Sequence, residues 1–375
     1  MIKSNRRIVM KIQNVVKKGV WETERRQLRE KLAQRVNYIR LDLNENLLDL
    51  DEKYFKDFIS GLKPELLSAY PDLSAIYQEM ADFVGVDENE IILTNGSDLA
   101  VKCLYDACIS KGDHILIHDP CYLMYERYAQ FFEAELEKIP MNMAWKPDLP
   151  LMKAQLRDNT RMVILETPSG YLGTQADLQS ITELAAELDK RDILLVIDEA
   201  YLYVANNKSE HLSLLKQFNN VVLLRTLSKA FGLAGARVGM VLAAPELIQQ
   251  LYKVRPLYEI SALAGEAAQW RLRNTDLLQE YQDNTRSNKN WLINQLNLLD
   301  IQCRDAAGNF IIVHFSDILG NNLFELLKSE GILIGKPYEL SALKHWWRIT
   351  VGNKQHCEIL IGKLALLKFS QVNIS

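Results

Sequence analysis

The sequence predicts an α/β protein in which a parallel sheet is covered by helices on both faces and is followed by a smaller α+β unit. Three observations support this prediction: the length of the chain, the alternation of apolar runs with helical patterns, and a change of pattern after residue 250. The 375 residues exceed the roughly 250–300 at which one hydrophobic core stops growing, so two packed units are expected. The composition, 48% hydrophobic and 25% charged, is typical of globular proteins and excludes collagen-like and largely disordered chains.

Six short apolar runs mark the expected strands. Between most of them lie about 15–30 residues with a helical pattern, such as Asn95–Ile109 and Asp177–Asp189. Strands that alternate with helices in this way indicate a parallel sheet, and right-handed crossovers then put the carboxyl ends of the strands at one edge. The runs are Ile91–Thr94, His114–His118, Met162–Glu166, Ile193–Asp198, Val221–Thr226 and Val238–Ala243.

Both ends of the chain differ from this rhythm. Residues 11–40 have the charged, amphipathic pattern of a helix. After residue 250 the expected elements are helices over Ser261–Arg271, Leu277–Leu299 and His356–Phe369, and short strands over Phe310–Phe315 and Trp347–Val351. We therefore expect an N-terminal arm (1–48) that joins the small domain and a subunit interface, a large domain (49–254) and a small domain (255–375).

Charge and cysteine content exclude several classes of protein. Residues 1–40 hold 12 Lys and Arg against three Glu, whereas the rest holds 32 basic against 45 acidic residues. A nucleic-acid protein keeps its positive charge on a folded face, so no nucleic-acid partner is expected for this acidic body. The chain has no run of 18 apolar residues and no secretory signal, so we expect no membrane span. Five scattered cysteines without a CxxC pair, and histidines without an HxH or HExxH cluster, indicate reduced cytoplasmic thiols and no metal site.

Reactive residues follow several of the expected strands, where ligands bind in open α/β sheets. Thr94–Asp98 opens a helix with small residues whose free N–H groups suit a phosphate, although a plain helix cap fits as well. Asp198 ends the fourth run, where a buried carboxylate needs a cationic or hydrogen-bonding partner. Lys229 follows the fifth run, and an amine in a dry cleft can form an imine. Arg237 lies in a glycine-rich turn that can hold its guanidinium against a phosphate.

Together these residues indicate one cofactor. Lys229 can form an imine with an aldehyde, Asp198 can hold a protonated ring nitrogen, and Ser97 with Arg237 can grip a phosphate. Pyridoxal phosphate is the common cofactor that has an aldehyde, a pyridine and a phosphate. Nucleotide sites are excluded because no GxGxxG follows the first strand and no GxxxxGK[ST] occurs, and no GxSxG nucleophile elbow is present.

The sequence resembles a known family, the fold-type I pyridoxal phosphate-dependent aminotransferases of class I/II. Within this family it resembles the histidinol-phosphate aminotransferase branch. The resemblance runs from about Leu41 to the C-terminus. Its most specific part is T-L-S-K-A-F-G-L-A-G-A-R-V-G over Thr226–Gly239, with the upstream D-E-A-Y over Asp198–Tyr201. The other matching stretches are Leu43–Asn46, Ala69–Asp72, Thr94–Asp98, Asp119–Tyr125, Val254–Tyr258 and Trp347–Gly352. The resemblance implies a three-layer α/β/α large domain with a mostly parallel seven-stranded sheet, plus a smaller α+β domain.

The resemblance also implies a role for each matching residue. Lys229 forms the covalent bond to the cofactor and carries the proton, Asp198 pairs with the ring nitrogen, and Arg348 binds the substrate carboxylate. The other implied contacts are Tyr201 with the ring hydroxyl, Tyr122 on the ring face, and Ser97, Asp98, Thr226, Arg237 and Tyr70 of the partner subunit with the phosphate. A site completed by a neighbour implies a homodimer. The segment around Asn44 is expected to line the substrate entrance, and a turn with capped backbone groups fits equally well.

Three positions depart from the family pattern. Gly170 stands where the family has the Asn that holds the ring hydroxyl, so Ser169 or a water is expected to substitute. The two arginines that bind the phosphate of histidinol phosphate fall at His314 and Gly335, with Lys336 able to supply part of the charge. Charge-assisted phosphate contacts contribute about 1.5–3 kcal/mol each, so we expect a substrate other than histidinol phosphate.

Three functions follow from these residues. The first is amino transfer between an amino acid donor and a small keto or aldehyde acceptor. The second is a pyridoxal phosphate-dependent decarboxylation of phosphoserine or phosphothreonine, suggested by the altered Ser169–Gly170 site. The third is a non-catalytic protein that keeps the fold, which the intact Lys229 argues against.

Overall fold

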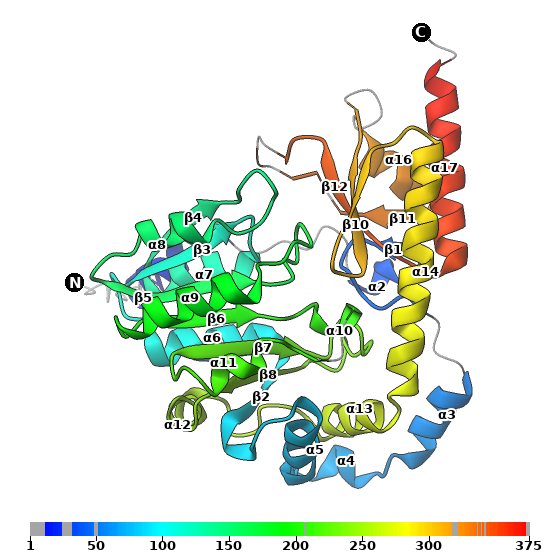
Figure 1. The fold of residues 1–375 in the computed structure, drawn as a ribbon. Helices are drawn as coiled ribbons and strands as arrows, with labels where there is room; N and C mark the ends of the chain where they lie inside the picture. Colours follow the sequence, from blue (N-terminus) through cyan, green and yellow to red (C-terminus); the bar gives the residue numbers. More distant parts are fainter. Residues whose placement is uncertain are drawn as a thin grey trace, which may run out of the picture.

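Figure 1 shows two packed units, a larger one built on a twisted sheet and a smaller one at the upper right. The computed structural model describes residues 12–24, 32–48, 52–205, 208–316, 322–335, 337–338, 340 and 343–372. The first elements along the chain are η1 (Ile12–Asn14), α1 (Lys18–Glu22), α2 (Leu32–Arg35), β1 (Ile39–Leu41), α3 (Glu52–Gly61), α4 (Glu65–Ser68), α5 (Ser74–Val84) and η2 (Glu88–Glu90). Within the described residues, no helix is both long enough and apolar enough to cross a bilayer.

The large unit contains a seven-stranded sheet with strand order β2-β8-β7-β6-β5-β3-β4. Its strands are β2 (Ile91–Asn95), β3 (His114–Asp119), β4 (Glu135–Pro140), β5 (Thr160–Glu166), β6 (Leu194–Asp198), β7 (Val221–Thr226) and β8 (Val238–Ala243). All neighbouring pairs are parallel except the two made by β8, which is antiparallel to both β2 and β7. The carboxyl ends of the six parallel strands and the start of β8 therefore meet at one edge of the sheet.

Helices cover both faces of this sheet, which confirms the predicted three-layer architecture. Alternate residues of the strands belong to two separate hydrophobic cores because successive side chains of a strand point to opposite faces. One core includes α5, α9 (Leu178–Asp189) and α13 (Ala262–Arg273), and the other includes α6 (Gly96–Cys108), α7 (Leu123–Phe132) and α12 (Pro245–Val254). The remaining helices of this unit are α8 (Leu149–Ala154), α10 (Leu202–Ala205) and α11 (Leu212–Leu215).

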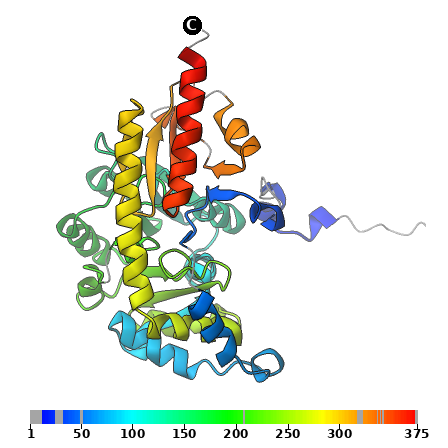
Figure 2. The same cartoon turned by 90° about the vertical axis from the view of Figure 1, so that its right-hand side faces the viewer.

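The small unit has its own core. Helices α14 (Asp276–Leu298) and α17 (Lys354–Val372) pack side by side against a three-stranded sheet of order β12-β10-β9, as Figure 2 shows. Its other elements are β9 (Cys303–Asp305), β10 (Phe310–His314), α16 (Leu323–Ser329), β11 (Ile332–Ile334) and β12 (Trp346–Thr350). The N-terminal strand β1 pairs in parallel with β11, so the start of the chain is tied into this unit.

The structure differs from the sequence prediction in several elements: β9, α16 and β11 of the small unit were not predicted, and neither were the edge strand β4 and the broken course of the N-terminal segment. The sequence did not reveal β4, because this edge strand pairs only with β3 and its segment, Glu-Leu-Glu-Lys-Ile-Pro, has a single buried residue. The single helix expected over residues 11–40 is wrong for the described part of that range. Thr23 is extended after α1, and Ile39 begins a strand, because α1 packs on α7 while β1 pairs with β11.

Candidate active site

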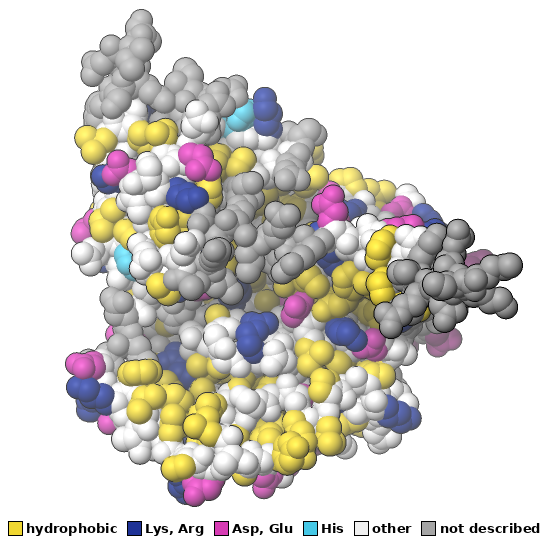
Figure 3. Space-filling view, turned by 180° about the vertical axis from the view of Figure 1, so that it is seen from behind, with side chains coloured by type: hydrophobic (Ala, Val, Ile, Leu, Met, Phe, Trp, Pro, Cys, Tyr) yellow, Lys and Arg dark blue, Asp and Glu magenta, His cyan; other side chains and the backbone are white. Residues whose placement is uncertain are grey.

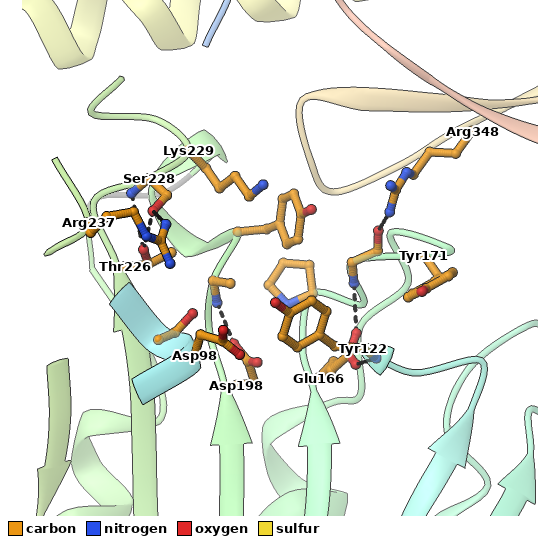
Figure 4. Close-up of a pocket in the computed structure, with 15 residues that line it drawn as sticks. Asp98, Tyr122, Glu166, Tyr171, Asp198, Thr226, Ser228, Lys229, Arg237 and Arg348 are labelled. Atoms are coloured by element: carbon orange, nitrogen blue, oxygen red, sulfur yellow. Dashed lines mark hydrogen bonds between the residues drawn. The ribbon is translucent and has the colours of Figure 1, made fainter. Parts of the chain in front are cut away.

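A cavity opens at the edge of the large sheet where the parallel strands end, and Figure 4 shows the side chains around it. About 690 Å³ of space between its walls is not filled by protein atoms, and this figure includes open solvent. Most of the residues predicted from the sequence line it: Ser97, Asp98, Tyr122, Asp198, Tyr201, Thr226, Lys229, Arg237 and Arg348. The small unit contributes Arg348 from β12, so both units build the cavity.

Lys229 enters the cavity from the loop between β7 and β8. Its Nζ donates a hydrogen bond to the backbone carbonyl of Leu43 at 3.0 Å and lies 5.7 Å from the centre of the Tyr201 ring. The loop begins where β7 ends, at a register pair between Thr226 and Gly239. The antiparallel pairing of β7 with β8 thus returns the chain to the same edge and brings Arg237 beside Lys229.

Arg237 forms a polar cradle with the ends of two strands. Its Nη1 donates to the Ser228 hydroxyl at 3.4 Å, and the Thr226 hydroxyl donates to the same oxygen at 2.9 Å. A Cβ on Gly96 would lie 2.3 Å from Arg237 Nη2, and a Cβ on Gly239 would lie 2.4 Å from the backbone nitrogen of Ser97. The two glycines therefore let the guanidinium and the first turn of α6 approach each other without a side chain between them.

Asp198 ends β6 at the floor of the cavity. Its Oδ2 accepts a hydrogen bond from the Tyr125 hydroxyl at 2.7 Å, and its Oδ1 accepts one from the backbone N–H of Ala200 at 3.0 Å. Burial raises the pKa of Asp198, while these two hydrogen bonds act in the opposite direction. The carboxylate is thus fixed in orientation and is ready to pair with a cation.

Arg348 lies on the opposite side of the cavity from Arg237 (Figure 4). Its Nη1 donates to the backbone carbonyl of Gly170, and its guanidinium lies 5.4 Å from the Tyr171 ring centre and 5.6 Å from that of Phe310. Two aromatic faces and one carbonyl hold the guanidinium in place, and its remaining donors can meet an anionic group.

Glu166 is a cavity residue that the sequence analysis missed. It ends β5 as the register partner of Asp198, and only 4% of the residue is exposed. Its Oε1 accepts the N–H of Tyr122, and its Oε2 accepts the N–H of Gly170 at 3.1 Å. Burial, with a further contribution from Asp198, raises the pKa of Glu166 to about 8. The available signal was its place at the end of an apolar run, the same signal that identified Asp198.

Two predicted residues lie outside the cavity lining. Ser169 is not part of the lining, and its hydroxyl accepts the N–H groups of Tyr171 and Leu172 within its own turn, at 3.3 Å and 3.2 Å. Asn44 is buried behind the cavity, where its Nδ2 donates to the Tyr201 hydroxyl at 2.8 Å and its Oδ1 accepts from Thr350. Asn44 therefore supports Tyr201 instead of lining the substrate entrance.

Tyr70 is also absent from this cavity and lies on the surface of the molecule. It is 80% exposed and stacks on Tyr258, with ring centres 4.7 Å apart. The contact joins two stretches that the family resemblance singled out, Ala69–Asp72 and Val254–Tyr258. An exposed aromatic pair of this kind is available to a second protein surface.

The positions of the two missing arginines have different surroundings. The His314 ring packs against Trp346 and His345, with centres 5.1 Å and 5.9 Å away. A Cβ on Gly335 would lie 2.6 Å from the backbone oxygen of Arg348, so this backbone leaves no room for a side chain there. Lys336, the expected partial substitute, lies outside the described residues.

The cavity fits the pyridoxal phosphate that the sequence predicts. The cradle kept free of Cβ atoms by Gly96 and Gly239 combines a guanidinium, hydroxyl groups and the N-terminus of the 13-residue helix α6, which is a donor set for a phosphate. The same cavity holds a buried carboxylate at Asp198 and a primary amine at Lys229. These groups match the three functional parts of the cofactor.

Comparisons with known proteins agree with this geometry. The model of the family described as aminotransferase class I and II matches residues 36–364. A histidinol-phosphate aminotransferase from Yersinia enterocolitica is 32% identical over 337 residues, covering 87% of this chain and 86% of its own length. One from Buchnera aphidicola is 30% identical and covers 97% of this chain and 100% of its own.

Solved structures show the same fold. The histidinol-phosphate aminotransferase from Sinorhizobium meliloti in complex with pyridoxal-5'-phosphate superimposes with a TM-score of 0.84 at 22% identity, covering 94% of this chain and 97% of that one. A variant of aspartate aminotransferase from Thermus thermophilus gives 0.77 at 16% identity, with coverage of 93% and 98%. The fold is that of the fold-type I aminotransferases, and the chain belongs to the aminotransferase class I and II family.

Proposed function

We propose that this pyridoxal phosphate-dependent aminotransferase moves an amino group between an amino acid and a small keto or aldehyde acceptor, with Lys229 as its catalytic residue. One observation carries the proposal: Lys229, Asp198 and the Arg237 cradle line one cavity. When bound, the cofactor supplies an aldehyde carbon that takes up the amino group and a ring that withdraws electrons from it.

Lys229 is suited to carry the proton in this reaction. Its Nζ is a primary amine on a flexible stem, and a single hydrogen bond to the Leu43 carbonyl holds it at the cavity wall. The amine can leave this bond and take the proton from the α-carbon of a bound substrate as a general base. The centre of the Tyr201 ring lies 5.7 Å from this amine, on the same cavity wall.

Asp198 and Arg237 hold the two ends of the cofactor in this proposal. Asp198 presents a carboxylate, oriented by Tyr125, to the ring nitrogen, where an anion favours the protonated ring. Arg237, with the Ser97, Thr226 and Ser228 hydroxyls and Asp98 nearby, receives the phosphate. Tyr122 supplies an aromatic face above the ring, a contact worth about 0.5–1.5 kcal/mol.

Arg348 binds the anionic group of the substrate. It lies across the cavity from the Arg237 cradle, so the substrate carboxylate and the cofactor phosphate have separate cationic partners. A planar guanidinium can form two parallel hydrogen bonds with a carboxylate, which orients the α-carbon. Orientation of this kind directs the α-hydrogen toward Lys229.

We further propose that histidinol phosphate is not the substrate. The His314 ring packs against the rings of Trp346 and His345. An arginine at position 335 would collide with the backbone oxygen of Arg348. The competing candidate is histidinol phosphate itself, favoured by the names of relatives that align over most of this chain. No relative or structure reported above supports the decarboxylase alternative, since all carry the name of an aminotransferase.

The homodimer remains part of the proposal, with Tyr70 of the partner subunit reaching the phosphate. Hydrophobic side chains gather across the lower part of the face shown in Figure 3. Two segments of the chain expose several hydrophobic residues each, at Phe55, Ile59, Leu67 and Tyr70, and at Tyr252, Leu257, Tyr258 and Leu263. A second subunit would bury such a surface. Sedimentation equilibrium of the full chain tests this, and a monomer at micromolar concentration would contradict it.

The reaction is tested by single-turnover spectroscopy of the full chain loaded with pyridoxal phosphate. Glutamate and a panel of other amino acids are mixed with the enzyme, and at least one is expected to abolish the visible band and release its keto acid. Histidinol phosphate is tested in parallel, and a higher kcat/KM than for every amino acid would overturn the substrate proposal alone. Carbon dioxide release from phosphoserine or phosphothreonine, without amino transfer, would contradict the proposal that the enzyme is an aminotransferase.

A further inference from the structure

Three sides of the cavity carry residues that the proposed function assigns to parts of the cofactor. In Figure 4, Arg237, Ser228 and Thr226 lie on one side, Asp198 lies at the floor, and Lys229 lies across from it. In pyridoxal phosphate the ring nitrogen and the aldehyde carbon are at opposite corners of the ring. The phosphate arm is on one of the two edges between them, and the ring hydroxyl is on the other.

The chemistry of the ring therefore fixes which side of the cavity meets the hydroxyl. With the nitrogen at Asp198, the aldehyde at Lys229 and the phosphate at Arg237, the hydroxyl edge faces the side opposite the cradle. In Figure 4 that side is occupied by Glu166. Gly170 lies there as well and has no side chain that could reach the ring.

Packing supports Glu166 as the residue that fills this place. A Cβ built on Gly170 would lie 2.9 Å from the Tyr201 ring and 3.5 Å from Glu166 Oε2. A side chain at position 170 would thus collide with Tyr201 and would be in van der Waals contact with the Glu166 carboxyl. Glycine at this position therefore leaves the Tyr201 ring and the Glu166 carboxyl beside the bare backbone.

The Glu166 carboxyl is held rigidly at this edge. Its two oxygens accept the N–H groups of Tyr122 and Gly170, and its own backbone N–H donates to His118 Nε2 at 2.9 Å. His118 is fully buried, and its Nδ1 lies 3.0 Å from the carbonyl of Pro120. Each carboxyl oxygen keeps a second lone pair or a proton for a group within the cavity.

The neighbours of Glu166 carry both signs of charge. The charge of Asp198 on β6 opposes ionisation of Glu166, whereas the charge of Arg348 on β12 favours it. Other titratable groups that interact electrostatically with Glu166 are Cys121, Tyr125 and Tyr171. A carboxyl in these surroundings can hold or release a proton in the neutral pH range.

We propose that Glu166 is the residue facing the hydroxyl edge of the pyridoxal ring and that its carboxyl shares the proton at that edge with the ring oxygen and the Lys229 nitrogen. This inference rests on the proposed function, since it requires pyridoxal phosphate in the cavity. Glu166 is thereby a second cofactor-contacting carboxyl beside Asp198, with a separate task. Asp198 acts at the ring nitrogen, and Glu166 acts where the ring meets Lys229.

The first test is a pH titration of the visible absorption band of the cofactor-loaded protein. Glu166→Gln and Glu166→Ala both remove the carboxyl that shares this proton, so the proton should be held less tightly and the pKa of the spectral transition should fall by about one unit or more. Glu259→Gln is the matched control, since Glu259 is a buried carboxylate paired with Arg255 and hydrogen-bonded by Tyr77, and it is absent from the cavity lining. The control should titrate like the wild type.

A transition that stays at the wild-type pH in a folded Glu166 variant would overturn the proposal. Thermal unfolding shows which variants are folded. One folded variant, Glu166→Gln or Glu166→Ala, is sufficient for this test. If the wild type itself shows no lysine-dependent visible band, judged against Lys229→Ala, the proposed function fails and the Glu166 proposal fails with it. A wild-type band with unshifted Glu166 variants overturns only the Glu166 proposal.

The second test does not depend on the covalent bond or on activity. In a Lys229→Ala background, binding of pyridoxal phosphate is measured by equilibrium dialysis with and without Glu166→Ala. Loss of the Glu166 contact should weaken binding roughly tenfold, which corresponds to about 1.4 kcal/mol. Equal dissociation constants in the two proteins would overturn the contact, while Glu259→Gln in the same background should leave the constant unchanged.

Discussion

The Tyr125 hydroxyl donates a hydrogen bond to Asp198 Oδ2 at 2.7 Å, and both residues are buried. The bond joins α7 to the end of β6 and orients the carboxylate at the cavity floor. Because burial raises the pKa of Asp198 and this hydrogen bond lowers it, Tyr125 helps to keep Asp198 ionised. Tyr125 is a positioning residue that acts through Asp198.

Tyr125→Phe should therefore weaken the proposed interaction of Asp198 with the ring nitrogen of the cofactor. We expect pyridoxal phosphate to bind about tenfold more weakly, because loss of a hydrogen bond to a charged group costs about 1.5–3 kcal/mol. Cofactor dissociation followed by fluorescence measures this change. Tyr128→Phe is a control on the same helix, since the Tyr128 ring packs against Tyr105 and Phe131. The same loss of affinity in both variants would contradict the special role of Tyr125.

The phosphate cradle can be tested with two glycines on either side of Arg237, Gly235 in the loop and Gly239 in β8. Gly239→Ala places a Cβ 2.4 Å from the backbone of Gly96 and Ser97, so the cradle must shift and phosphate affinity should fall. Gly235→Ala is the matched control, because a Cβ there meets nothing within 4 Å. Dissociation constants for pyridoxal phosphate and inorganic phosphate should rise at least about tenfold for the first variant only. Similar dissociation constants for the two variants would contradict the assignment of this cradle as the phosphate site.

Arg348→Lys should separate substrate binding from cofactor binding. The lysine keeps the charge but loses the planar fork that can grip a carboxylate and stack between the Tyr171 and Phe310 rings. We expect KM for the amino acid donor to rise about tenfold or more, with cofactor affinity unchanged. Steady-state kinetics together with cofactor titration provide the comparison. An unchanged KM would exclude Arg348 as the carboxylate partner.

His118 should make the cofactor-free protein sensitive to acid. Burial lowers the pKa of His118 from 6.5 to about 4, so between these pH values the unfolded chain binds a proton that the folded chain does not. The free energy of unfolding should therefore rise as the pH increases from 4 to 6.5, by up to about 3 kcal/mol from this group. Urea unfolding of the wild type and His118→Gln across this range measures the contribution. Parallel pH profiles for the two proteins would show that His118 does not supply it.

Much of the site could be predicted because the strands of this sheet are apolar runs with reactive residues directly after them. The positions of Asp198, Lys229 and Arg237 follow from that pattern, since parallel strands bring their carboxyl ends to one edge. The edge strand β4 could not be found in the same way, because its one buried residue leaves no apolar run.

The places of Glu166, Ser169 and Asn44 were harder to predict, because they depend on side-chain direction. Ser169 turns its hydroxyl toward its own loop, while Glu166, three residues earlier, points into the cavity. Asn44 supports Tyr201 from behind, a contact between residues 157 positions apart in sequence. Sequence spacing identifies which strand ends are near the site, but only packing shows which side chain reaches the cavity.

The most direct test of the central claim is identification of the residue that bonds covalently to the cofactor. The full chain is incubated with pyridoxal phosphate, reduced with borohydride, digested and mapped by mass spectrometry. The account predicts that the reduced cofactor is attached to Lys229 and that amino acid substrate added before reduction removes this attachment. Absence of label at Lys229, or label that persists unchanged after every amino acid donor, would contradict it.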